Sequence, residues 1–428
     1  MKLLKNRNFM VMLSGRMVTN IGEGLYAVAA MWLIFELSGS TFYTGLVGFF
    51  SIIPRLIQFV SGPIIDRLPL RQLLVSAQII QALLLFTVPI LYFFDFLNVG
   101  YLLIITPLMS LFNMIIFPAQ TAALPTIVET KDLTKANSWF TLVYQGIDTL
   151  TFALGGVIVG LTGAIAVYLM DVILLLIAAF IFSFLSIRAK ISPSKHKVPI
   201  KSRVKIYRKE LEEGIEILKV EAFKKLLIGV LLTNAVWAGI IAISPQFAAQ
   251  NGGSAFYGFL LAAVATGSLI GALIAPLIKL FEQVGLGKIY SFAFMLSGTF
   301  MLAIFFSPWN WLTILLFCLA SIPGGVTNIL INATIQKGIP KEMLGRVFSA
   351  AFSLSGFAAP LGSLIGGSVI GVLFGTEIMI VIGGFVTILV GSWWLVDRVT
   401  RDLPKMENIT PEVFLPKRFL DKKQVDNG

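Results

Sequence analysis

The chain is a series of long apolar runs separated by short polar stretches. A helix crosses the hydrocarbon core of a bilayer with roughly 20 apolar residues, and a scan for such runs finds twelve. Each run is too long and too evenly apolar for the alternating strands of a transmembrane barrel. The pattern therefore predicts an all-α integral membrane protein with twelve transmembrane helices. The predicted spans are 9–36, 44–65, 73–94, 100–124, 139–161, 164–187, 224–248, 255–278, 287–307, 310–335, 347–373 and 376–396.

Composition agrees with this class. Of the 428 residues, 57% are hydrophobic and 13% are charged, whereas about a quarter of the residues of a soluble protein are charged. The single cysteine, Cys318, excludes an intramolecular disulfide, and the single histidine, His196, leaves no His/Cys cluster for a metal. We therefore expect no metal and no cofactor.

The start of the chain, Met1–Phe9, is basic like the first part of a signal peptide. The apolar run behind it contains Arg16 and Glu23, is longer than a signal peptide's apolar region, and lacks a cleavage site of small residues. We expect this run to be retained as the first helix.

The basic residues predict an orientation. If Met1 is cytoplasmic, the loops that face outward contain no Lys or Arg. Apart from Arg16 and Arg55, which lie inside predicted helices, all the bases fall on the inward side. By the positive-inside rule both termini then lie in the cytoplasm, and we expect a multi-pass protein of the bacterial plasma membrane. Topology thus accounts for the net charge of +11, and we expect no nucleic-acid partner.

The longest inward loop divides the helices six and six. We predict an N-terminal six-helix bundle at 1–188, a cytoplasmic linker at 189–222, a C-terminal six-helix bundle at 223–400 and a cytoplasmic tail at 401–428. The tail is polar, and we expect it to be loosely ordered.

The linker has two parts. Its basic run, Lys195–Lys209, suits a cytoplasmic loop near anionic headgroups. The following segment, Glu210–Leu218, carries apolar residues at 211, 215 and 218, which form a helical face suited to the membrane surface.

The two halves match as repeats. Three glycines of the run 139–161 recur in the run 347–373, each 211 positions later: Gly155 with Gly366, Gly156 with Gly367 and Gly160 with Gly371. At a displacement of 213, Gly45 matches Gly258 and Asp66 meets Lys279. With the layout of six helices in each half, these matches favour two related bundles around a central path, as in transporters.

A charged turn between the second and third runs resembles the signature of the major facilitator superfamily, G-x-x-x-D-R-x-G-R-K. The matching residues are Gly62, Asp66, Arg67 and Arg71. Pro69 and Leu70 depart from it, since the family has glycine and a base there.

More narrowly, the chain is similar to the drug:proton antiporter branch, which includes macrolide-efflux proteins and a siderophore exporter. The resemblance runs from Asn8 to about Arg398. It is carried by Pro54-Arg55, Leu124-Pro125, Leu133-Thr134-Lys135-Ala136-Asn137-Ser138, Asp171 and Glu213-Gly214. It implies two pseudo-symmetric six-helix bundles that export amphipathic small molecules by alternating access, in exchange for protons. The proline of the glycine motif that such antiporters carry in helix 5 is absent before Gly155.

The resemblance implies that Asp66 latches the two halves on the cytoplasmic side while the pump faces outward. The helix near Arg346 begins at that face, and its positive dipole end favours a carboxylate by roughly 0.3–1 kcal/mol. Arg67 and Arg71 could hold the acid, with Asp132 or Glu129 as further partners. The alternative is an ordinary solvated loop cluster.

Glu23 lies near the middle of the first helix, where an ionised group costs at least ~2.5–3.5 kcal/mol unless it is paired or hydrated. Such a carboxyl could take up a proton from outside and release it inward, as an antiporter requires. Arg55 and Arg16 are candidate partners. A permanent structural bridge between Glu23 and Arg55 remains the alternative.

Other polar residues inside the predicted helices are weaker candidates. Asp148 could carry a proton or contact a cationic substrate, or be structural. We interpret Asp171 as structural, because the resemblance places its helix at the periphery of the fold. Asn113, Gln120, Asn328 and Asn332 could contact substrate in the cavity or form hydrogen bonds between helices.

The sequence motifs do not identify the substrate. Lipophilic drugs such as macrolides are the leading class, and a dedicated exporter of a siderophore, a biosynthetic product or a lysolipid is the alternative. A polytopic membrane enzyme is disfavoured, since no H-E-x-x-H, D-x-D or phosphate-loop motif is present. A channel is disfavoured by the repeat layout and by the charged turn motif. The proton gradient is the expected energy source, and the expected partners are a small molecule, protons and lipids around a monomer.

Overall fold

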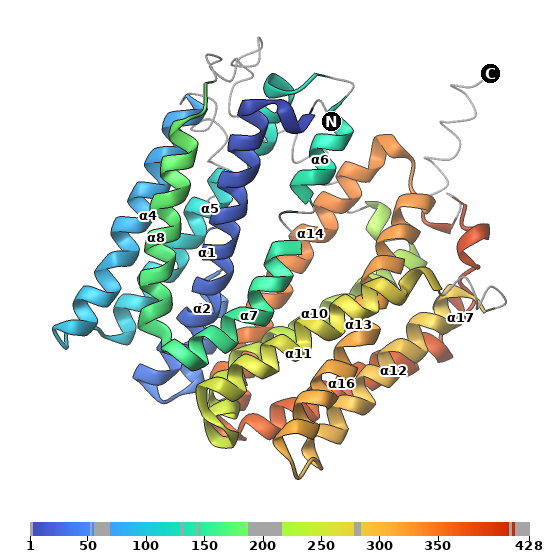
Figure 1. Ribbon diagram of the computed structural model, residues 1–428. Helices are drawn as coiled ribbons and strands as arrows, with labels where there is room; N and C mark the ends of the chain where they lie inside the picture. The colour runs from blue at the N-terminus through green and yellow to red at the C-terminus, as the bar shows by residue number, and fades with distance from the viewer. Residues whose placement is uncertain are drawn as a thin grey trace. The chain divides into compact units, whose positions relative to one another are not determined.

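The computed structural model describes residues 3–51, 54, 69–129, 132–141, 143, 146–186, 216–277, 284–410 and 413–415. Regular structure within these ranges is helical, as the sequence predicts (Figure 1). The helices are α1 (Arg7–Ser38), α2 (Thr41–Phe50), α4 (Leu70–Phe93), α5 (Val99–Ile127), α6 (Leu133–Thr141), α7 (Ile147–Thr162), α8 (Ala164–Ser183), α10 (Glu221–Asn251), α11 (Gly253–Ile274), α12 (Leu286–Phe305), α13 (Asn310–Gly338), α14 (Lys341–Ser363), α15 (Gly371–Leu373), α16 (Thr376–Val396) and α17 (Arg398–Arg401), with short η1 (Leu3–Lys5), η5 (Leu364–Ile370) and η6 (Met406–Asn408).

Local signals set the ends of several helices. The side chain of Asn6 accepts a hydrogen bond from the backbone N–H of Phe9 and so caps the start of α1. Gly39 ends α1 with a φ of 63°, a left-handed conformation that glycine adopts without steric cost. Asn98 caps α5 in the same way as Asn6 caps α1.

Within the described residues, eight helices are long and apolar enough to cross a membrane. They are α1, α4, α8, α10, α11, α12, α13 and α16. The multi-pass prediction is confirmed, while the count of twelve stays a prediction. The predicted span 139–161 includes parts of α6 and α7 rather than one described helix, and the run 347–373 contains a π-helical segment, η5, between α14 and α15.

The described helices form two compact units. Unit 1 comprises Met1–Lys197 with Ala242–Ala262, and unit 2 comprises Val198–Ile241 with Ala263–Gly428. These units cut through α10 and α11, so their limits differ from the predicted bundles at 1–188 and 223–400. The domain boundaries therefore stay a prediction.

In unit 1, α1 packs against α5, α7 and α8, and α4 packs against α8. Figure 1 shows α4 and α8 side by side. One apolar core, which includes Phe9, Met12, Leu74 and Phe182, lies among these helices. Gly156 of α7 faces Gly258 of α11 so closely that a Cβ on either residue would collide with the other's backbone, as expected for small residues at a membrane helix interface.

In unit 2, α12 packs against α13 and α16. The core there includes Tyr290, Leu330 and Trp394. Leu218, which the sequence places on a face suited to the membrane surface, is instead buried in this core, and residues 211 and 215 lie outside the described ranges.

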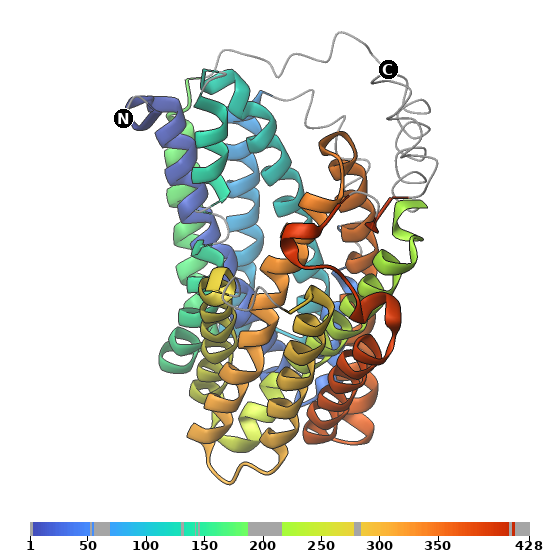
Figure 2. The same cartoon turned by 90° about the vertical axis from the view of Figure 1, so that its right-hand side faces the viewer.

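The segment that follows α16, residues 397–410 and 413–415, corrects the expectation of a loosely ordered tail for this part of it, while 411, 412 and 416–428 lie outside the described residues. In Figure 2 this red segment lies against the end of the orange α13. The Lys337 ammonium donates hydrogen bonds to the carbonyl oxygens of Met406 and Glu407, at 2.6 and 2.8 Å. Scattered apolar residues of the segment are buried, which offsets the cost of ordering a mostly polar chain. These residues are Leu403, Ile409, Phe414 and Leu415.

Candidate functional site

A charged pair lies within helix α1 of unit 1. Nη2 of Arg16 and Oε2 of Glu23 are 3.7 Å apart. The two residues are seven positions apart, about two helical turns, so both side chains lie on one face of the helix. The Arg16 side chain is 2% exposed and that of Glu23 is 19% exposed. An arginine so deeply buried in an apolar helix costs much free energy unless a carboxylate compensates its charge. Arg16, one of the two cations that the sequence suggested, is the one seen beside Glu23.

Asp171 of α8 joins this neighbourhood. It is 1% exposed, and its carboxylate lies so close to Gly22 that a Cβ there would overlap Oδ1. Asp171 also interacts electrostatically with Glu23. Within the described residues, Oδ1 of Asp171 has no hydrogen-bond partner. The acid that the sequence assigned to a peripheral helix thus packs directly against the helix of the charged pair.

Two tyrosines lie near Asp171. The rings of Tyr26 and Tyr168 meet edge to face with centroids 5.5 Å apart, and both residues interact electrostatically with Asp171. The hydroxyl of Tyr168 has no hydrogen-bond partner within the described residues. Unit 1 thus gathers one cation, two acids and two hydroxyl groups on α1 and α8.

Buried amides extend the polar set to α4 and α5. Nε2 of Gln81 donates to Oδ1 of Asn113 at 2.8 Å. Gln78 and Gln120 are fully buried, and their amide groups have no hydrogen-bond partner within the part of the chain that the structure describes. Asn113 is therefore part of an interhelical hydrogen bond, one of the two roles that the sequence left open.

Several predicted residues cannot be placed. Gly62, Asp66, Arg67 and Arg55 lie outside the described residues. Asp148 lies on α7 and Arg346 on α14, with their side chains outside the described part.

The remaining residues of the proposed latch can be placed. Arg71 is exposed in the first turn of α4. The backbone N–H of Asp132 donates to the carbonyl of Glu129 at 2.9 Å. The helix start expected near Arg346 falls at Lys341.

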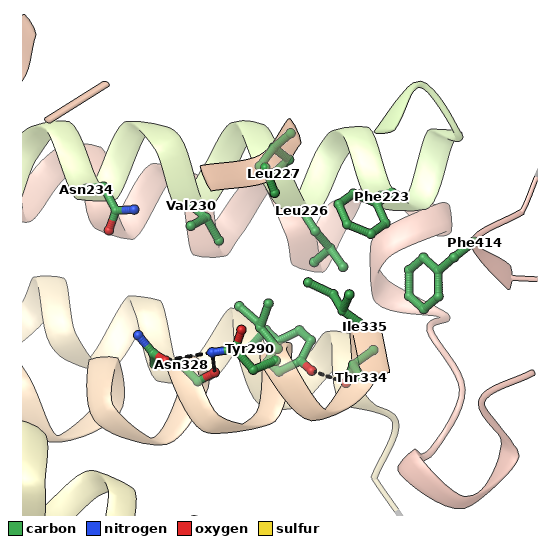
Figure 3. Close-up of a pocket in the computed structure, with 13 residues that line it drawn as sticks. Phe223, Leu226, Leu227, Val230, Asn234, Tyr290, Asn328, Thr334, Ile335 and Phe414 are labelled. Carbon is green, nitrogen blue, oxygen red and sulfur yellow. Dashed lines mark hydrogen bonds between the residues drawn. The ribbon is translucent and has the colours of Figure 1, made fainter. Parts of the chain in front are cut away.

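Unit 2 contains a pocket of a different kind (Figure 3). Its volume is about 200 Å³. Most of the wall is apolar, from α10 and α13, while Asn234 and Asn328 lie at one end and Phe223 and Phe414 at the other. No charged side chain is among the described residues that line it. The sequence named Asn328 and Asn332, and both line this pocket.

Sequence reasoning missed Asn234 and the two tyrosines. Asn234 gave the same signal as Asn328, an amide inside an apolar span, which favours a position facing other helices or water rather than lipid. Tyr26 and Tyr168 gave no such signal, because tyrosines are common in membrane helices. Among the described residues, no three His, Cys, Asp or Glu side chains gather as metal ligands would.

Comparison with known proteins finds transporters that are similar to this chain over most of its length. An uncharacterised transporter of Bacillus subtilis, YvqJ, is 23% identical over 90% of this chain and 91% of its own. The multidrug efflux pump Tap of Mycolicibacterium fortuitum is 22% identical over 85% of this chain and 89% of its own. Macrolide efflux protein A of Streptococcus pyogenes is 23% identical over 83% of this chain and 88% of its own.

Solved structures share the fold. A bacterial homologue of the human lysosomal transporter Spinster superposes with a TM-score of 0.70, covering 95% of this chain and 98% of its own at 11% identity. The family model for transmembrane secretion effectors matches residues 2–423. The chain therefore belongs to the transmembrane secretion effector family of major facilitator superfamily transporters.

Proposed function

We propose that this transporter exports amphipathic small molecules in exchange for protons, with both termini in the cytoplasm of a bacterial cell. Two relatives named as efflux pumps, one for macrolides and one for multiple drugs, support export. The absence of Lys and Arg from the outward loops supports the orientation.

The Arg16–Glu23 pair is the observation that supports proton exchange. While Glu23 is ionised, the pair is neutral overall, and the buried guanidinium is compensated. Protonation of Glu23 removes that compensation and leaves a buried positive charge, which is costly in low dielectric. Binding a proton therefore changes which arrangement of the surrounding helices is favourable, and this is the coupling that an antiporter needs.

The turn at Gly62–Arg71 is the proposed latch. The match of Gly62, Asp66, Arg67 and Arg71 to the family signature supports this role. Asp66→Asn should insert into the membrane normally but transport more slowly. Wild-type turnover by that variant would contradict the latch.

The experiment uses inside-out vesicles from bacteria that lack their own drug pumps. Erythromycin, a macrolide, should accumulate in vesicles that contain the wild-type protein when a proton gradient is imposed, and the accumulation should end when the gradient is collapsed. Glu23→Gln should abolish the gradient-driven accumulation, because the amide cannot take up the proton.

Glu36→Gln is the matched control, since Glu36 lies on the same helix and is exposed. Accumulation that does not depend on the gradient would contradict antiport. An equal loss of accumulation in Glu23→Gln and Glu36→Gln would contradict the role assigned to Glu23. A panel of drugs and natural products in the same vesicles would then define the substrate.

A further inference from the structure

Two facing helix surfaces form the pocket of unit 2. On α10 the lining residues Phe223, Leu226, Leu227, Val230 and Asn234 recur at helical spacing, so they share one face. Asn328, Ile331 and Ile335 form the opposing face on α13. Both helices are apolar enough to span a membrane, and the pocket runs between them (Figure 3).

The polar end of the pocket has a defined hydrogen-bonding character. Nδ2 of Asn332 donates to Oδ1 of Asn328 at 2.9 Å. The acceptor of Asn328 is therefore engaged, and its own N–H groups can donate to a ligand. Asn234 faces it from α10. With amide donors at one end and no charged residue in the described lining, the pocket suits a neutral molecule with a carbonyl or ether oxygen and an apolar body.

The opposite end is closed by the segment after α16. Phe414 is 1% exposed, and its ring meets that of Phe223 edge to face with centroids 5.7 Å apart. A Cβ on Gly338 would collide with the same ring. The hydrogen bonds from Lys337 to the carbonyls of Met406 and Glu407 hold the segment at the end of α13. Phe414 and Phe223 together thus close the apolar end of the pocket.

A lipid acyl chain is the other apolar molecule that a membrane protein meets. An acyl chain has no acceptor for the amides of Asn234 and Asn328, and leaving such groups unpaired against hydrocarbon is unfavourable. A pocket with amides at one end and aromatic rings at the other therefore suits an amphipathic solute better than it suits an acyl chain.

We propose that this pocket binds the apolar body of the exported molecule, a neutral compound with an acceptor oxygen, and that Phe414 limits the size of the compounds it accepts. This inference rests on the proposed function, because it assumes that the bound compound is the exported one. Binding to the pocket requires neither a proton gradient nor export, so a binding experiment can fail while the export experiment succeeds, or the reverse.

The experiment measures Kd by fluorescence for two neutral aminocoumarins with the purified full-length protein in detergent, after subtraction of protein-free micelles. One probe is small, and the other carries an added benzothiazole ring. Phe414→Ala should improve binding of the bulky probe relative to the small one by about tenfold, since even one methylene in an apolar pocket changes selectivity by ~10–200-fold. Asn328→Leu should weaken both probes roughly fivefold, the effect of one neutral hydrogen bond.

Leu415→Ala is the matched control. Leu415 is buried in the same segment but does not line the pocket, so its variant should leave the ratio of the two Kd values within about twofold. An unchanged ratio in Phe414→Ala, or the same change in both variants, would overturn the role of Phe414. Displacement of both probes by phosphatidylcholine in the wild type but not in Phe414→Ala would make the pocket a lipid site and overturn the proposal.

Discussion

The two units of this transporter carry different polar groups within their helices. Unit 1 buries Arg16 and Asp171, with Glu23 beside the first of them. Among the described residues of unit 2, no Asp, Glu, Lys or Arg is buried, and the polar groups in its mostly apolar pocket are amides and hydroxyls. Among the described residues, the buried charged groups thus lie in unit 1, while the polar groups of the unit 2 pocket are neutral.

The difference suggests a division of work. Ionisable groups in low dielectric respond strongly to a proton, whereas amides recognise neutral oxygens without changing charge. The two halves also differ in the turn motif, where Asp66 of the first half is matched in sequence by the oppositely charged Lys279 of the second. The predictions below test whether charge in unit 1 behaves differently from polar groups in unit 2.

The largest effect should come from Arg16→Met. This change leaves the Glu23 carboxylate without its cation, and we expect a loss of about 3 kcal/mol in the free energy of unfolding, because breaking a buried pair is costly. Thermal unfolding in detergent measures it. Arg16→Met with Glu23→Gln should recover most of the loss, since removing both charges is nearly neutral.

Asn328→Leu provides the comparison in unit 2. This amide is exposed, so the same assay should show a change within about 0.5 kcal/mol. A loss as large as that of Arg16→Met would contradict the difference between the units.

A smaller effect is expected from Gly22→Ala. The new Cβ would overlap the Asp171 carboxylate, and overpacking of this kind costs about 1–3 kcal/mol. Combining it with Asp171→Ala should recover part of the loss, so the two changes should not be additive. Gly324→Ala is the control in unit 2, where a Cβ would meet nothing within 4 Å. Equal destabilisation by both alanines would show that loss of glycine, and not contact with Asp171, is responsible.

The smallest effect concerns an ion pair of unit 2. Nζ of Lys225 donates to Oδ1 of Asp397 at 2.7 Å, with both side chains 20% exposed. This hydrogen bond is the main cause that lowers the pKa of Asp397, helped by the backbone N–H of Thr400 and opposed by partial burial. Since the folded pKa lies below the unfolded one, the stabilisation is present above the ordinary carboxyl pKa, about 4, and is lost as pH falls through the lowered value.

Asp397→Asn tests this linkage. The variant should have a slightly lower melting temperature at neutral pH and a shallower fall on acidification, while its amide oxygen can still accept from Thr400 at the start of α17. The measurement is thermal unfolding across acid pH. Parallel curves for variant and wild type would show that Asp397 does not contribute to the acid response.

Most of the fold could be predicted from the sequence, because long apolar runs leave few alternatives in a membrane. The helix ends at Gly39 and Asn98 follow from their residue types. The neighbour of Glu23 could not be chosen between Arg16 and Arg55 from spacing alone. Arg16 sits two turns away on the same helix, whereas Arg55 lies outside the described residues.

The sequence by itself determined a multi-pass helical transporter, its superfamily and a short set of intramembrane polar residues. The tertiary structure decided which of these residues meet: Asp171 against Gly22, Gln81 with Asn113, and Phe414 at the end of a pocket that also contains Asn328. The physical reason is that membrane helices are apolar on nearly every face. Hydrophobic periodicity therefore cannot separate the side that meets lipid from the side that meets another helix, and only packing between distant segments makes that choice.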